Sequence, residues 1–125
     1  MTTLLVDSHC HLDFPDFQGR EEELLAAMKT NSVGWALIAG VTLERFPGVL
    51  ALTERFPNLW ASVGVHPDTQ EGEEPDQDRL SRLAEHPRVV AIGETGLDYG
   101  WKAIWNGSAS VLLRISALRA GVASR

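Results

Sequence analysis

Four short, continuous apolar runs alternate along the chain with longer stretches in which apolar and polar residues mix. Uninterrupted runs of this length are typical of strands that are buried on both faces of a sheet. The predicted strands are Leu4–Val6, Val33–Val41, Leu59–Val65 and Val89–Gly93.

Helix signals occupy the stretches between these runs. Glu21–Lys29 begins with acids and ends with a lysine, which suits the helix dipole. Pro47–Phe56 begins with a proline, and Asp76–His86 is followed by one, as helix ends favour. Strands that alternate with helices, starting roughly 25–30 residues apart, indicate an α/β fold with a parallel sheet and right-handed crossovers.

Composition narrows the class of protein. A chain of 125 residues forms one domain at most, and 44% hydrophobic residues are enough for a core. The net charge of −6 argues against a protein that binds DNA through a basic face. The single cysteine excludes a disulfide framework and a cysteine-rich zinc module.

Targeting signals are missing from the sequence as it stands. The first residues lack the basic and apolar regions of a signal peptide. The longest apolar run, Val33–Val41, is too short to span a membrane. We therefore expect a cytoplasmic protein without membrane contact.

Two histidines follow the first predicted strand, in the segment Asp7-Ser8-His9-Cys10-His11. In an extended chain, residues two apart point to the same side, so His9 and His11 could bind one metal ion while Cys10 points away. The alternative is a pair of polar residues where a strand meets a loop, because short matches of this kind arise by chance. Asp13, a little further on, is interpreted as a loop residue.

Two further polar segments follow the third and fourth predicted strands. Glu94, directly after Val89–Gly93, could be a carboxylate ligand or bridge two ions, and Asp98 could orient a ligand or cap the loop. His66 could contact a metal or a phosphate, or be a structural histidine. Carboxyl ends of parallel strands share one edge, where α/β folds place their sites. The three segments together therefore favour a metal site.

The segments VDSHCHLD, GVHP and GETGLDY together resemble the TatD-type metal-dependent deoxyribonucleases, over about Leu4 to Tyr99. The resemblance implies a TIM-barrel fold and divalent metal ions, two in the complete family site, as Mg²⁺, Mn²⁺ or Zn²⁺. It also implies hydrolysis of phosphodiester bonds in DNA, often as a 3′-5′ exonuclease. Metal ions would carry phosphate recognition, which reconciles DNA cleavage with an acidic chain.

The resemblance also implies roles for single residues. Two histidines and a shared carboxylate would bind metal: His9, His11 and Glu94. Glu94 and His66 would be catalytic residues, with His66 near the substrate phosphate. Asp7 and Asp98 would support the site.

The chain departs from the family in its second half. The family's later strands supply two more histidines and a final aspartate, whereas His86 is the only histidine left here. A complete barrel needs roughly 250 residues. We therefore expect an incomplete TIM-barrel sheet of about four βα units, with little activity and with open edges that favour self-association.

A frameshift would explain why the resemblance stops at Tyr99. Back-translated codons for Gly100–Arg125, read one base out of phase, allow LEGDLEWQRERFAPHIRAARRCGKP, which looks like the family's own continuation. The expected organisation is thus the N-terminal half of a barrel at 1–99 and an out-of-frame tail at 100–125.

Two other functions remain open at this point. One is a different amidohydrolase-like enzyme that cleaves a small ester or amide with a metal. The other is a non-catalytic α/β fragment that binds metal. GETGLDY favours the nuclease, and the missing ligands favour the fragment.

Overall fold

The protein, described here from a computed structural model of residues 4–69 and 72–96, contains a four-stranded parallel sheet in the order β1-β2-β3-β4. The strands are β1 (Leu5–Cys10), β2 (Val33–Ile38), β3 (Leu59–Val63) and β4 (Val89–Ile92). The helices are α1 (Glu21–Thr30), α2 (Phe46–Arg55) and α3 (Gln77–Ala84), and the short 3-10 helix η1 (Pro15–Phe17) precedes α1. The predicted alternation and the parallel sheet are confirmed.

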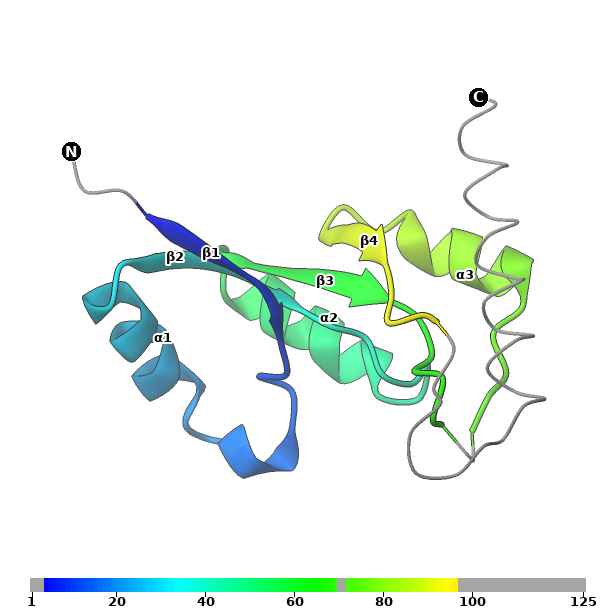
Figure 1. Cartoon of the computed structure of the whole chain (residues 1–125), viewed down its shortest axis with the longest axis horizontal. Coiled ribbons are helices and arrows are strands. Elements are labelled where there is room, and N and C mark those ends of the chain that lie inside the picture. Colours follow the sequence, from blue (N-terminus) through cyan, green and yellow to red (C-terminus); the bar gives the residue numbers. More distant parts are fainter. Residues whose placement is uncertain (1–3, 70–71, 97–125) are drawn as a thin grey trace.

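The core lies between the sheet and its helices, with α1 and α2 below the sheet in Figure 1. Its members are almost fully buried side chains from β2, β3, α2 and α3 and from the loops beside them. The largest of them are Phe46, Ile38, Leu59, Leu80, Val49 and Val63. Burying one such side chain contributes about 1.5–3 kcal/mol, so this layer holds the strand ends in place.

Helix ends follow the local signals in the sequence. The Asp76 carboxylate caps α3 by accepting a hydrogen bond of 2.8 Å from the Arg79 N–H. Helix α2 begins at Phe46, one residue before the predicted start at Pro47.

The expected tail at 100–125 and Asp98 lie outside the described residues. Within those residues, no helix combines the length and the apolar character needed to cross a bilayer.

One expectation about the strands is wrong. Strand β1 is not buried on both faces, since Leu5 is 58% and Val6 62% exposed. Trp35 in β2 and Val90 in β4 are also exposed. The physical reason is that the described helices pack mainly against β2, β3 and β4, and that β1 pairs only with β2 among the described strands. The strand also runs beyond the predicted end at Val6, so His9 lies within it.

Candidate metal centre

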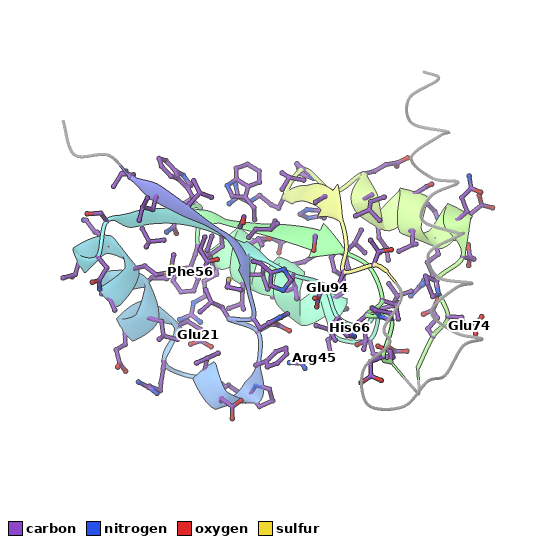
Figure 2. The ribbon with its side chains drawn as sticks, in the orientation of Figure 1. Glu21, Arg45, Phe56, His66, Glu74 and Glu94 are labelled. Atoms are coloured by element: carbon purple, nitrogen blue, oxygen red, sulfur yellow. The ribbon has the colours of Figure 1, made fainter. Side chains whose placement is uncertain are left out.

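The polar residues singled out in the sequence lie at the carboxyl ends of β1, β3 and β4. Parallel pairing aligns these ends, because Cys10 lies opposite Ile38 and Val63 lies opposite Ile92. Figure 2 shows Glu94 and His66 near one another at this edge. The expected convergence of the three segments is therefore present in the fold.

The ligand atoms of His9, His11 and Glu94 face one another. The Nε2 atoms of the two histidines are 3.3 Å apart, and His9 Nε2 is 3.4 Å from Glu94 Oε1. His11 Nε2 is 4.0 Å from Glu94 Oε2. One ligand atom from each residue lies within 4.8 Å of the others, which is the arrangement of a metal-binding group.

These distances test whether the residues fit a divalent ion. Two ligand atoms bound to zinc at about 2.0–2.1 Å with tetrahedral angles are roughly 3.3 Å apart. The two shorter separations in this cluster, 3.3 and 3.4 Å, match that spacing. Two imidazoles with a carboxylate also suit zinc and manganese by ligand type. The residues therefore fit the group that the sequence suggested.

A buried serine holds the backbone that carries Glu94. The Ser62 hydroxyl, in β3, donates to the Gly93 carbonyl at 2.9 Å and accepts from the Gly40 N–H at 3.1 Å. The Glu94 N–H in turn donates to the Gly40 carbonyl at 2.9 Å. Three strand ends are thus tied together by one side chain that is 3% exposed.

Two glycines let these strand ends approach each other closely. A Cβ on Gly64 would lie 2.6 Å from the Glu94 carbonyl oxygen, and one on Gly40 would lie 2.6 Å from the Ser62 carbonyl oxygen. Any larger residue would push the strand ends apart. Sequence patterns alone did not assign Ser62, Gly40 or Gly64 a role in the site, although Gly64 belongs to the GVHP segment and a serine inside an apolar strand is a readable signal.

His66 lies beside the cluster and not within it. Its ring atom Nδ1 accepts a hydrogen bond from the backbone N–H of Asp68 at 3.1 Å, and its backbone N–H donates to the Val41 carbonyl at 2.8 Å. These contacts direct Nε2 toward Glu94, whose Oε1 is 4.0 Å away. His66 is therefore placed where it could meet a group bound at the cluster.

Asp7 and Cys10 flank the two histidines. The Asp7 carboxylate accepts a hydrogen bond of 3.1 Å from the His9 N–H, so it steadies the backbone of that residue. Cys10 packs against the core, and burial raises the pKa of its thiol to about 11. A thiol that stays protonated at neutral pH is a poor ligand, in line with a cysteine that points away from the histidines.

Comparison with known proteins gives a consistent result. A family model described as TatD related DNase matches residues 6–115. The uncharacterized metal-dependent hydrolase YjjV of Escherichia coli is 38% identical over 101 residues, which cover 78% of this chain and 39% of YjjV. The 3′-5′ ssDNA/RNA exonuclease TatD of Salmonella typhimurium is 31% identical over 96 residues, which cover 76% of this chain and 37% of that protein.

Solved structures of other proteins also resemble this fold. The crystal structure of YjjV, a TatD homologue from Escherichia coli, matches with a TM-score of 0.79 at 34% identity, covering 91% of this chain and 46% of that one. A hydrolase TatD family protein from Entamoeba histolytica matches with a TM-score of 0.76 at 24% identity, covering 97% and 47%. The chain spans less than half the length of these relatives.

Proposed function

Since this chain belongs to the TatD related DNase family, we propose that His9, His11 and Glu94 form part of a divalent-metal site that hydrolyses phosphodiester bonds in DNA. The observation that carries the proposal is the convergence of the three ligand atoms at one sheet edge. The relative named a 3′-5′ ssDNA/RNA exonuclease supports nucleic acid as the substrate class.

The residues divide the work by their chemistry. His9 and His11 would offer their Nε2 atoms to one ion, and Glu94, with its two carboxylate oxygens, would be the ligand shared with a second ion. His66, 34% exposed, lies where it can contact the substrate phosphate. Asp7 keeps His9 in place, and we assign Asp98 the same kind of supporting role from the resemblance. When bound, the ions would neutralise phosphate charge and activate water.

A non-catalytic metal-binding fragment is the second candidate, and the ligands that this sequence lacks favour it. The chain covers 39% of YjjV. The two further histidines and the final aspartate of the resemblance have no counterpart in this sequence. We propose that the 125-residue chain retains metal binding and little hydrolysis.

We also propose that residues 100–125 are read out of frame. The support is the back-translation. Trp101-Lys102 leaves no choice of codon in the shifted frame and encodes Glu there, as in the continuation that resembles the family. The family match that runs on to residue 115 weighs against it. Sequencing the coding DNA across the Tyr99 codon decides between the two.

Activity of two products tests the proposed function. The second product is translated from coding DNA with one base inserted after the Tyr99 codon, up to the next stop codon. The 125-residue chain should degrade 3′-labelled single-stranded DNA in Mg²⁺ at least about a thousandfold more slowly than this longer product. The reason is that the restored reading frame returns metal ligands and a water-activating carboxylate. The extended chain carrying His9→Ala and His11→Ala is the matched control. No activity from the extended chain would refute the nuclease assignment, and equal activity from both chains would refute the effect of truncation.

We propose, in addition, that the chain pairs with a second copy of itself through the open edges of its sheet. Exposed apolar side chains gather on and next to the edge strands: Leu4, Leu5, Val6 and Val90. Leaving several such side chains in water costs a few kcal/mol, which is a large share of a domain's stability.

Sedimentation velocity tests this pairing. We expect dimers or larger species at micromolar concentration, and we expect Val6→Lys to shift them toward monomer because a lysine on an edge strand opposes pairing. Gln18→Lys changes the net charge equally on an exposed loop and is the control. A wild-type monomer at these concentrations contradicts the proposal.

A further inference from the structure

His11 lacks the contact that usually orients a metal-binding histidine. The second ring nitrogen of such a residue usually donates its N–H to a carboxylate, a carbonyl or water, and this hydrogen bond fixes the ring and its tautomer. Here Nδ1 of His11 is buried without a hydrogen-bond partner among the described residues. The rotation of this ring about its last torsion angle, which is broad for histidine, must be limited by other contacts.

Phe14 provides such a contact. Its ring stacks on the His11 imidazole, with the centroids 4.6 Å apart and the planes at 26°. The turn between the two residues holds them together, because the Phe14 N–H donates to the His11 carbonyl at 3.0 Å. Rotating the imidazole out of this plane would break the stacking.

Arg45 holds Phe14 in turn. Its guanidinium carbon lies 4.5 Å from the centroid of the Phe14 ring, a cation–π distance. Nη2 of Arg45 also lies 3.3 Å from Oδ2 of Asp13 and donates to the Asp13 carbonyl at 3.2 Å. The Asp13 side chain is 5% exposed, so the guanidinium is anchored to a buried carboxylate. In Figure 2, Arg45 lies below Glu94 and His66.

We propose that Phe14, held by Arg45 and Asp13, is a positioning residue that fixes the His11 ring so that Nε2 faces His9 and Glu94. The stacking holds the plane of the ring and opposes its half turn, a restraint that a hydrogen bond at Nδ1 would otherwise supply. Phe14 does not touch substrate or metal in this scheme and acts only through His11. The inference rests on the proposed metal site for its effect on affinity, and its effect on the ring is measurable without metal.

The test compares metal affinity and ring motion in the 125-residue chain. Phe14→Leu should raise the Kd for Zn²⁺ about tenfold in a calorimetric titration, the loss typical of removing a contact that orients a ligand. Phe14→Tyr keeps the ring and should stay within about twofold of wild type. Arg45→Lys, which keeps the charge and loses the planar fork, should fall between them. Phe14→Met replaces Phe14→Leu if the leucine variant does not fold.

Ring motion gives the readout that a merely structural role would not change. A half turn of the imidazole exchanges Nε2 with Cε1, so carbon relaxation dispersion at His11 Cε1 in the metal-free protein should show exchange in Phe14→Leu and none in wild type or Phe14→Tyr. Phe56→Leu is the matched control, because Arg55 lies over Phe56 at 4.7 Å and neither residue is among the metal-binding group.

Each outcome decides the proposal. It is overturned if Phe14→Leu leaves the Kd and the His11 dispersion unchanged, or if Phe56→Leu weakens Zn²⁺ binding as much. An unchanged Kd in Arg45→Lys removes Arg45 from the scheme. If wild type binds no Zn²⁺, the proposed function fails, and the dispersion data alone then confirm or overturn the positioning role.

Discussion

The double change His9→Ala and His11→Ala is expected to weaken the binding of Mn²⁺ or Zn²⁺ more than about a hundredfold. Removing only a residue that orients a metal ligand already lowers metal affinity about ten- to a hundredfold, and this variant removes two ligands themselves. The double variant leaves Glu94 as the one remaining member of the metal-binding group. A single carboxylate competes poorly with the water that surrounds a free ion. Calorimetric titration of the folded variant, checked by circular dichroism, measures the loss.

His86→Ala is the control for this experiment. Nε2 of His86 lies 3.2 Å from Glu54 Oε1, and neither residue belongs to the metal-binding group. This variant should keep the wild-type Kd within about twofold, because it leaves the ligands untouched. Unchanged binding in the double histidine variant would place the metal elsewhere and refute the assignment.

Gly64→Ala should both destabilise the protein and damage the site. The new Cβ would lie 2.6 Å from the Gly93 carbonyl carbon and 2.6 Å from the Glu94 carbonyl oxygen. These are backbone atoms with no rotamer to change, so the strand ends must separate. We expect a loss of about 3 kcal/mol in the free energy of unfolding, and roughly tenfold weaker metal binding because Glu94 moves with the backbone.

Gly48→Ala is the matched control for this substitution. Gly48 lies in α2, and a Cβ there would meet nothing within 4 Å. Alanine is the better helix former by about 1 kcal/mol, so this variant should gain stability and keep its metal affinity. Urea denaturation measures both variants. A Gly64→Ala protein as stable as wild type would show that the strand ends adapt.

Local patterns were sufficient to predict the order of strands and helices and the segments that meet at the site. Parallel strands place their carboxyl ends at one edge, so His9, His11 and Glu94 could be brought together from the sequence without coordinates. His9 lies in β1 and His11 directly after its end, and this spacing of two residues in an extended segment made the direction of both side chains predictable.

Contacts between distant segments were beyond such reasoning. Arg45 reaches Asp13 across 32 residues, and Ser62 reaches Gly93 across 31. Neither contact leaves a pattern in its own segment, although the prediction that Asp13 lies in a loop is confirmed. The exposure of β1 was missed for a related reason. An apolar run shows that a strand prefers burial, whereas the described residues leave side chains exposed on both faces of β1.

The order of strands in the sheet has a consequence for how the site is assembled. Strand order follows chain order, so each new strand can add to the one made just before it, through crossovers that are local by the standards of a parallel sheet. The metal-binding group differs from this pattern, because it joins the end of the first described strand to Glu94, two residues past the end of β4. During synthesis, the two histidines therefore emerge long before their carboxylate partner. An ion can be bound by all three residues only after the four described strands have paired. Binding then links the end of β1 to the end of β4, the two described strands that lie farthest apart in the sequence.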